Sequence, residues 1–584
     1  MSQTKEIPQM EKIVSLAKRR GFIFQSSEIY GGINGFWDYG PLGAELKRNL
    51  RDTWWRAMTR DREDVVGLDA TIIMHPAIWK ASGHVDTFSD PMADCRVTQK
   101  RFRADHVELQ SGMAYRWTGA TDASGKKSEE TFSALLAGGK PPESARKIAV
   151  QFYTLRGLTN PELLGETTEK VENTRAFNPE NGAQLTEPVP FNLMFKTYIG
   201  ATATEEDKAY LRPETAQAIF AQFKNVVDSS RQKVPFGICQ IGKAFRNEVT
   251  PRNFTFRSRE FEQMELEFFI KPDEAIEAVC GKVAAWHEGA DLSKPQDNWG
   301  WEMWHRYWVK ERTDYYAGIG LGAEVLDYHW QAKDELAHYA RACVDILFKF
   351  PFGTEELEGI AARGDFDLMA HQTASKKPLD VFDEEVKNAF AKWTDEQRAA
   401  LLERKKAEQR AKEKGGMTDA QVDDWCQKLF KGFYVPHVIE PSAGLDRLAL
   451  AVIANAFTEV EKADAKGKTE ILTVMRFHPR IAPVKVGVFP LLKNKPELVA
   501  KAREVFETLR RHLPTFYDEG GSIGKRYARQ DEAGTPFCVT IDFETLGEKG
   551  DELKDTVTLR RRDDASQERV KIAELLSRLL PLVS

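Results

Sequence analysis

Residues 240–269 read QIGKAFRNEVTPRNFTFRSREFEQMELEFF, and this stretch decides the interpretation of the whole chain. Both ends alternate in the manner of strands, and the middle, with Pro251, Asn253 and several arginines, has the composition of a loop. We therefore predict two antiparallel strands joined by a basic loop. Alternate residues of the second strand should share a face. One face would carry Phe261, Gln263, Glu265 and Glu267, and the other Glu262, Met264, Leu266 and Phe268.

A half-exposed hairpin with solvated charges is the simpler alternative, because charged side chains mostly lie on protein surfaces. The mixture of residue types favours a binding site instead. Guanidinium groups, an aromatic ring and carboxylates on one hairpin could hold a phosphate, a flat ring and an ammonium group together. The arginines are Arg246, Arg252, Arg257 and Arg259.

Length and composition set limits on this interpretation. The 584 residues predict two to four domains, and 83 Lys+Arg against 89 Asp+Glu give a net charge of −6. No global basic field is present, so nucleic-acid contacts would depend on local patches. Six scattered cysteines without a CxxC pair indicate neither a disulfide framework nor a zinc ribbon, and they favour a reduced, cytoplasmic protein. No 18-residue apolar run predicts a membrane span, and the N-terminus lacks a signal peptide pattern.

Three segments resemble the motifs of the class II aminoacyl-tRNA synthetases. The run Phe245-Arg246-Asn247-Glu248, followed by a loop and Phe261, resembles motif 2. Its sequence is most similar to that of the glycyl-tRNA synthetases of the homodimeric type. A predicted helix at residues 42–59 and a predicted strand at residues 65–74 resemble motif 1, which builds the dimer interface in that family. The strand that ends in EPSAG (residues 440–444) and the apolar helix after it resemble motif 3. Residues 10–108, 190–270, 345–370 and 433–580 carry the resemblance.

The resemblance implies an α/β fold with an antiparallel class II sheet, flanking helices, insertions and a C-terminal α/β anticodon-binding domain. We expect residues 1–108 to form the N-terminal part of the catalytic domain and residues 109–188 an inserted subdomain. Residues 189–472 would form the catalytic core, with a solvent-facing helical insertion at about 383–431. Residues 473–584 would form the anticodon-binding domain, because a proline-containing linker at 475–483 precedes alternating strands and helices.

Four local predictions accompany these boundaries. A helix should begin after Pro213 with Glu214 in its first turn, where helix capping is the alternative role for this carboxylate. Helical patterns occur at residues 128–136 and 142–155. Residues 273–347 read as mostly helical, and the Trp301, Trp304 and Trp308 stripe within them predicts a core helix rather than base stacking.

By this resemblance the chain is a glycine–tRNA ligase that uses ATP to form glycyl-adenylate and then charges tRNA(Gly). Arg246 would hold the α-phosphate, Arg257 the outer phosphates and Arg447 the γ-phosphate, as planar, always charged guanidinium groups suit phosphate oxygens. Phe261 would stack on adenine, Glu248 would accept from its amino group, and Glu356 would bind Mg²⁺. The catalytic residues would be Arg246, Arg447 and Glu356. The ATP site would comprise Arg246, Asn247, Glu248, Phe256, Arg257, Ser258, Arg259, Glu260, Phe261, Glu356, Leu357, Gly444, Leu445, Asp446 and Arg447.

Glycine offers only an ammonium and a carboxylate, so its site must bind these groups and exclude any side chain. Glu214, Glu265 and Glu440 would face the ammonium, Arg363 would lie near the carboxylate, and Ser442 would block larger substrates. The glycine site would comprise Arg103, Glu214, Phe261, Glu262, Gln263, Met264, Glu265, Arg363, Glu440, Pro441, Ser442, Ala443 and Gly444.

Metal and partner expectations follow from the same resemblance. Relatives often carry paired CxxC sequences near Cys95, and their absence here predicts no zinc. The expected assembly is a homodimer without membrane contact. A non-catalytic nucleic-acid-binding paralogue on the same scaffold is the main alternative, and the presence of Arg246, Glu248, Phe261 and Arg447 disfavours it. A synthetase for proline, threonine or serine is disfavoured by the carboxylates and by EPSAG.

Overall fold

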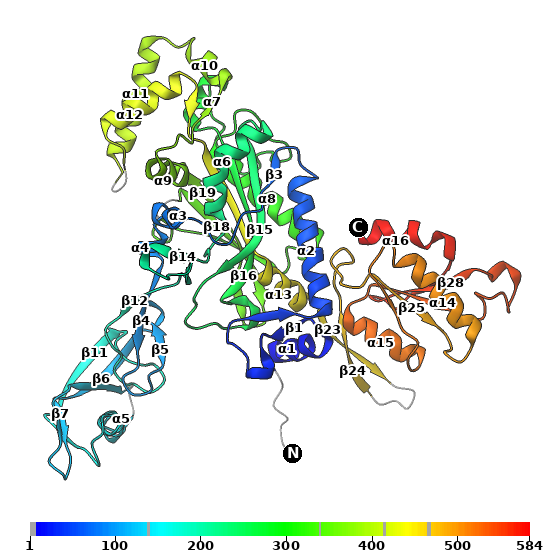
Figure 1. The fold of residues 1–584 in the computed structure, drawn as a ribbon, viewed down its shortest axis with the longest axis horizontal. Helices are drawn as coiled ribbons and strands as arrows, with labels where there is room; N and C mark the ends of the chain where they lie inside the picture. Colours follow the sequence, from blue (N-terminus) through cyan, green and yellow to red (C-terminus); the bar gives the residue numbers. More distant parts are fainter. Residues whose placement is uncertain (1–7, 137–139, 338–339, 413–415, 464–468) are drawn as a thin grey trace. The chain divides into compact units, whose positions relative to one another are not determined.

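A computed structural model describes residues 8–136, 140–337, 340–412, 416–463 and 469–584. The chain divides into two compact units, which are described separately below. One unit comprises residues 83–195, and the other comprises residues up to 82 together with residues from 196 onwards. Figure 1 shows the elements of both units along the chain.

A seven-stranded sheet forms the centre of the larger unit, and the expected hairpin lies within it. The hairpin strands are β15 (Phe236–Phe245) and β16 (Glu260–Ile270), which pair antiparallel with Gln240 opposite Glu265. Within this sheet, β15 and β3 pair parallel, and the other neighbouring strands pair antiparallel. The prediction of an antiparallel sheet is therefore confirmed. Its strands, in spatial order, are β17 (Leu326–Trp330), β18 (Ala342–Phe350), β19 (Gly353–Gly364), β22 (His437–Gly444), β16, β15 and β3 (Val65–Gly67).

Helices cover both faces of this sheet, and the alternation of β16 separates the two sets (Figure 1). Met264, Leu266 and Phe268 pack in one apolar cluster with α2 (Pro41–Thr59), α8 (Trp301–Gly318) and α13 (Leu445–Ala456). Phe269 packs in a second cluster with α6 (Ala216–Ser230) and α9 (Phe366–Ser375). Trp304 and Trp308 are buried in the first cluster, so the prediction of a core tryptophan stripe is confirmed.

The unit of residues 83–195 is larger than the subdomain expected at 109–188. It begins earlier because β4 (Ser89–Asp94) pairs with β12 (Val189–Asn192) at the other end of the unit. The helix expected at 142–155 is confirmed as α5 (Glu143–Leu155). The helical reading of 128–136 is wrong, because β9 (Phe132–Leu136) pairs with β6 (Gln110–Trp117) and buries alternate residues such as Phe132 and Ala134.

Two further expectations about the larger unit need correction. Among the described residues of 273–347, only those of α7 (Asp273–Cys280) and α8 form α-helices, since β17 and β18 extend the central sheet. The insertion is helical as expected, with α10 (Glu384–Phe390), α11 (Asp395–Arg410) and α12 (Asp419–Phe430). It is not wholly solvent-facing, because Leu401 and Leu429 are buried in the second apolar cluster and Lys405 pairs with Glu274 of α7.

The C-terminal region forms a five-stranded sheet in the order β26, β25, β27, β28, β29. Its elements are β25 (Val486–Pro490), α14 (Pro496–Leu509), β26 (Thr515–Tyr517), α15 (Ile523–Ala533), β27 (Phe537–Ile541), β28 (Thr556–Arg561), β29 (Gln567–Lys571) and α16 (Leu575–Val583). The expected alternation of strands and helices is confirmed from β25 to β27, after which β28 and β29 form an antiparallel pair before α16. No helix among the described residues is both long and apolar enough to span a bilayer.

Candidate active site

Three buried carboxylates from two neighbouring strands meet on the α6 side of the central sheet. Glu265 and Glu267 lie on β16, and Glu440 lies on β22. One oxygen from each lies within 4.8 Å of the others. Ser442 is paired directly opposite Glu265. The period of two on each strand places these side chains on one face, as the sequence predicted for Glu265 and Glu267.

Arg363 of β19 provides the positive charge beside this cluster. Its Nη1 donates to both oxygens of Glu440, at 2.6 and 2.8 Å, and its Nε and Nη2 donate to Asp367 of α9, at 2.8 and 2.9 Å. Asp367 also accepts from Gln217 of α6, whose amide donates in turn to Glu214 at 3.0 Å. Both carboxylates therefore hold the Arg363 guanidinium in place within a network that reaches Glu214.

Glu214 lies just before α6 rather than in its first turn, because the helix begins at Ala216 after Thr215. The expected position of Glu214 inside the helix is therefore wrong. The Thr215 side chain does not cap the helix, and its hydroxyl donates to Glu265 at 2.6 Å. This turn thus supplies both a half-buried carboxylate and a hydroxyl to the cluster.

Burial is the main cause of the unusual ionisation of this cluster. It raises the pKa of Glu265, while the hydrogen bond from Thr215 opposes the shift. Burial also raises the pKa of Glu440 to about 8, even though Arg363 favours its charged form. The pKa of Glu267 is raised well above its usual value by burial and then by the charge of Glu440. Such crowded carboxylates favour a bound cation.

A second group of residues combines arginines with aromatic rings. Arg246 follows β15, and its guanidinium lies 5.3 Å from the centre of the Phe261 ring. Its Nε donates to the carbonyl of Pro213 at 3.0 Å. Arg447, in the first turn of α13, lies 4.6 Å from the centre of the Phe256 ring, and its Nη1 is 3.1 Å from Glu356 Oε2. The structure therefore brings two pairs together, Arg246 with Phe261 and Arg447 with Glu356.

Backbone contacts hold the loop between β15 and β16. Arg259 donates from Nε to the Glu248 carbonyl at 2.8 Å and from Nη1 to the Asn34 carbonyl at 2.9 Å. Arg257 lies 3.9 Å from the Glu248 carboxylate, and the buried Ser258 hydroxyl donates to the Thr255 carbonyl. The contacts of Arg259 are structural, and the side chains of Arg257 and Glu248 are partly buried, at 29% and 14% exposed.

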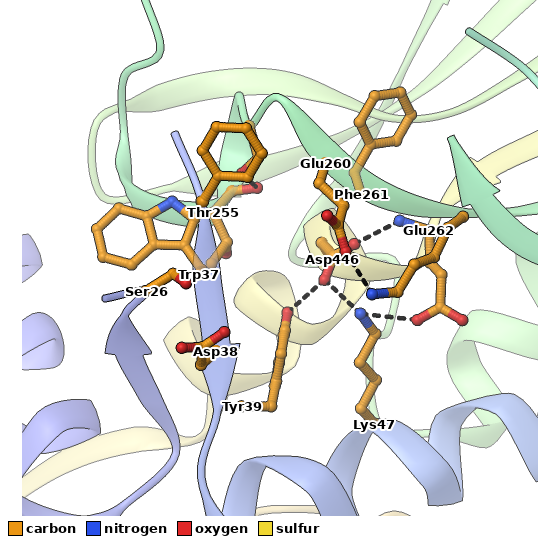
Figure 2. Close-up of a pocket in the computed structure, with 13 residues that line it drawn as sticks. Ser26, Trp37, Asp38, Tyr39, Lys47, Thr255, Glu260, Phe261, Glu262 and Asp446 are labelled. Atoms are coloured by element: carbon orange, nitrogen blue, oxygen red, sulfur yellow. Dashed lines mark hydrogen bonds and ion pairs between the residues drawn. The ribbon is translucent and has the colours of Figure 1, made fainter. Parts of the chain in front are cut away.

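Several predicted site residues lie on the other face of the sheet. Lys47 of α2 donates to Asp446 at 2.7 Å and pairs with Glu262 at 2.8 Å, and Tyr39 also donates to Asp446 (Figure 2). Asp446 accepts from the Glu262 backbone N–H at 2.6 Å. These residues line a cavity of about 280 Å³, next to Glu260, which pairs with Lys243. The buried side chains of Met264, Leu357, Ala443 and Leu445 lie in the apolar cluster on that side.

The alternation of the strands explains this correction. Glu262 and Met264 are one residue out of phase with Glu265, so their side chains cannot reach the carboxylate cluster. Only their backbone atoms could contribute to a glycine site. Gln263 and Gly444 are paired with each other and share the phase of Glu265 and Ser442, whereas Pro441 has the phase of Ala443 and so belongs to the other face.

Comparisons with known proteins give the family. Residues 195–288 match the model of the tRNA synthetase class II core domain (G, H, P, S and T), and residues 485–581 match that of the anticodon binding domain. The glycine–tRNA ligase of Rhodopirellula baltica is 44% identical over 98% of each chain. That of Thermus thermophilus is 42% identical over 97% of each chain, and that of Treponema denticola is 40% identical over 98% of this chain and 96% of its own.

The chain belongs to the glycine–tRNA ligase family. The expected class II fold with a C-terminal anticodon-binding domain is confirmed by these matches.

One predicted residue of this glycine–tRNA ligase lies in the other compact unit. Arg103 ends β5 (Arg101–Arg103), where its side chain pairs with Asp90 at 3.1 Å and Asp105 at 2.9 Å. Its contact with glycine stays a prediction.

Sequence reasoning missed three residues of the carboxylate cluster. Glu267 had been placed on the correct face, and the alternation of β16 could have identified it. Asp367 is four residues after Arg363, a spacing that brings side chains together at a helix start. Thr215 gave no signal, since its bond to Glu265 joins residues 50 positions apart.

Proposed function

We propose that this chain activates glycine with ATP on the carboxylate-lined face of the central sheet and then transfers it to tRNA(Gly). The carboxylate cluster beside Arg363 carries this proposal, because a buried anionic pocket suits a small substrate whose only cationic group is an ammonium. The first product would be glycyl-adenylate with release of pyrophosphate. A terminal ribose hydroxyl of the tRNA would then attack the activated carbonyl.

Arginines would stabilise the charge that develops during activation. Arg246, beside Phe261, would bind the α-phosphate and the glycine carboxylate, while Phe261 stacks on adenine. Arg447 would bind the γ-phosphate, and Arg257 the outer phosphates. Glu248 would accept from the adenine amino group. The partial exposure of Arg257, at 29%, and of Arg447, at 26%, supports this arrangement, since both guanidinium groups could reach a polyphosphate.

Glu356 would hold Mg²⁺. Its carboxylate is about half-exposed, at 48%, and is an oxygen donor of the kind that Mg²⁺ prefers. Burial, and to a smaller extent the charge of Glu356, raises the pKa of Asp345 on the neighbouring strand, so the two carboxylates lie near each other. A bound Mg²⁺ would neutralise phosphate charge. Glu356 would contribute by keeping Arg447 in place until the nucleotide arrives.

Glu214, Glu265 and Glu440 would bind the glycine ammonium, and Ser442 would stand where a larger side chain would project. We propose that Arg363 acts as a positioning residue rather than a contact to the glycine carboxylate. Its guanidinium already donates to Glu440 and Asp367 over four hydrogen bonds of 2.6 to 2.9 Å. Steric closure discriminates better than an apolar pocket, where one methylene is worth only about 1–3 kcal/mol.

Pyrophosphate exchange measured with each amino acid in turn tests this function. Exchange should depend on glycine, and alanine, serine and proline should support little. Absence of exchange with every amino acid would favour a nucleic-acid-binding protein, and preferential exchange with another amino acid would reject the pocket assignment.

We also propose that the protein is a homodimer of the α2 type. Support comes from the motif 1 resemblance and from three exposed apolar side chains, Ile29, Tyr30 and Ile33, which lie after α1 (Gln9–Arg20). Light scattering should give twice the chain mass of 66.3 kDa. A monomer at micromolar concentration would contradict the proposal.

Location and metal content are proposed on chemical grounds. The six free cysteines suit a cytoplasmic protein. We propose no zinc site near Cys95, because its sulfur accepts a hydrogen bond from the Thr98 N–H at 3.5 Å and the sequence has no second cysteine nearby. Metal analysis of the purified protein would test this.

A further inference from the structure

Glu267 differs from Glu265 and Glu440 in its lack of hydrogen-bond partners among the described residues. It lies on β16 opposite Ile238, and its side chain is fully buried. Neither carboxylate oxygen has a hydrogen-bond partner among the described residues. An unpaired ionised carboxylate in this position would be costly, since burial of a charge requires a compensating partner. The functional assignments above give Glu267 no role.

Charged groups from four elements face Glu267. They are Glu265 on β16, Glu440 on β22, Arg363 on β19 and Asp367 on α9. Arg363 is the only cation among them, and it donates hydrogen bonds to Glu440 and Asp367. Glu267 therefore faces three carboxylates and an arginine that is already engaged by two of them.

A protonated Glu267 resolves this crowding. Burial and the charge of Glu440 both raise the pKa of Glu267, which supports the neutral form at neutral pH. A neutral carboxylic acid has one O–H donor, which a carboxylate lacks. Oxygens of Glu265 and Glu440 lie within 4.8 Å of a Glu267 oxygen, so a modest side-chain rotation brings the donor to either acceptor.

We propose that Glu267 is a neutral carboxylic acid at the inner end of the glycine pocket, where its O–H hydrogen-bonds to Glu265 or Glu440 and orients these carboxylates toward the ammonium. Glu267 is a positioning residue in this arrangement and does not touch the substrate. The inference rests on the proposed function of Glu265 and Glu440 as ammonium partners. An ionised Glu267 would instead make the three glutamates a site for a metal ion.

Infrared difference spectroscopy tests the protonation state directly. The spectrum of the wild type minus that of Glu267→Gln, at about pH 7.5, should contain the carbonyl stretch of a protonated carboxylic acid. Glu274→Gln is the matched control, because Glu274 is also a buried glutamate but is paired with Lys405, and it should remove no such band. Absence of the band from the Glu267 difference spectrum would overturn the proposal. This measurement needs no enzymatic activity.

Kinetics then test the positioning role. Glu267→Gln keeps a neutral N–H donor and should leave the glycine KM in pyrophosphate exchange within about threefold of the wild type. Glu267→Leu removes the donor and should raise the glycine KM at least about tenfold, with the ATP KM within about twofold. A tenfold loss in the Gln variant, or a normal glycine KM in the Leu variant, would overturn the role.

The experiments remain decisive if one variant fails to fold. If Glu267→Leu does not fold, the infrared band and the Gln variant still decide the proposal. Failure of the proposed function gives a different result, because the wild type would then show no glycine-dependent exchange while the infrared band could still be measured.

Discussion

Arg246 and Arg447, the two arginines of the proposed nucleotide site, come from different elements, so each can be tested alone. Arg246→Ala and Arg447→Ala should each reduce adenylate formation by about two orders of magnitude, because each removes a charge-assisted contact to a developing phosphate charge. Pyrophosphate exchange measures this loss. Arg510→Ala is the matched control, since Arg510 is exposed and pairs only locally with Glu507. Exchange within about threefold of the wild type for either site variant would reject its assignment.

The proposed role of Glu440 as an ammonium partner predicts that glycine binding depends on pH. Its pKa is raised to about 8, chiefly by burial, so its charged form increases as the pH rises through that value. An ammonium binds the charged form better, and the glycine KM of the wild type should therefore fall between about pH 7 and about pH 8.5. Glu440→Gln should raise the glycine KM, lose this pH dependence and leave the ATP KM unchanged. A change confined to the ATP KM would mean that Glu440 serves the nucleotide.

Ser442 is the residue that we propose limits the size of the substrate beside Glu265. The two residues are directly paired across β22 and β16, so removal of the serine side chain opens the pocket where a substrate methyl group would project. Ser442→Gly should improve alanine-dependent exchange by up to about tenfold, the range expected for one methyl group. Ser442→Thr is the opposing variant and should lower exchange with both amino acids. If Ser442→Gly left alanine-dependent pyrophosphate exchange unchanged, another residue would have to exclude the larger substrates.

At the scale of elements, Lys47 joins α2 to two other parts of the core. It donates to Asp446 at the start of α13 and pairs with Glu262 on β16, while its own side chain is only 14% exposed (Figure 2). Lys47→Met would leave two buried carboxylates without this partner. We expect the free energy of unfolding to fall by about 3–5 kcal/mol, as for other broken buried ion pairs. Chemical denaturation measures it.

Arg48 offers a control on the same helix. Its side chain is 71% exposed and lies 3.9 Å from Asp52, so Arg48→Met should change the free energy of unfolding by less than about 1 kcal/mol. Equal stability of the Lys47 and Arg48 variants would show that the cluster of Lys47, Glu262 and Asp446 does not hold these elements together.

The same cluster shows what the sequence could predict about the site and what it could not. The period of two placed Glu265 and Glu262 on opposite faces of β16, and the structure confirms this. The glycine site nevertheless included Glu262, because the resemblance identifies a run of residues and does not distinguish side chains from backbone. The alternation of side chains along a strand therefore predicts which face of the sheet a residue occupies more accurately than a motif match does.

The sequence pattern could not predict side-chain contacts between elements that are far apart in the chain. Arg363 meets Glu440 because β19 and β22 pair in register, and Thr215 meets Glu265 because the start of α6 packs against β16. Strands β17 and β18 were missed for a related reason, since they follow a long aromatic helix and gain their strand character from pairing, β17 with β18 and β18 with β19. Local propensity is weaker than such tertiary pairing in short segments.

At the scale of the whole molecule, the boundary before the anticodon-binding domain is later than the predicted start at residue 473. Met475, Phe477, Ile481 and Ala482 are buried in the apolar cluster of α2 and α13, whereas Val486 and Val488 belong to the C-terminal cluster. Asn49 of α2 also donates to the Ala482 carbonyl at 2.9 Å. A chain shortened to residue 471 would lose part of the catalytic core.

A chain that ends at Pro483 keeps this core and the motif residues, so it should still catalyse glycine-dependent pyrophosphate exchange. It lacks the domain that matches an anticodon-binding model. Anticodon recognition uses stacking and hydrogen bonds to base edges, with a salt-dependent contribution from phosphate contacts. Charging of tRNA(Gly) should therefore fall by at least about a hundredfold, mainly through a raised KM for tRNA. Parallel assays of exchange and charging on the same preparation separate the two steps. Loss of both would indicate a damaged catalytic core, and full-rate charging would show that tRNA(Gly) is recognised without the C-terminal domain.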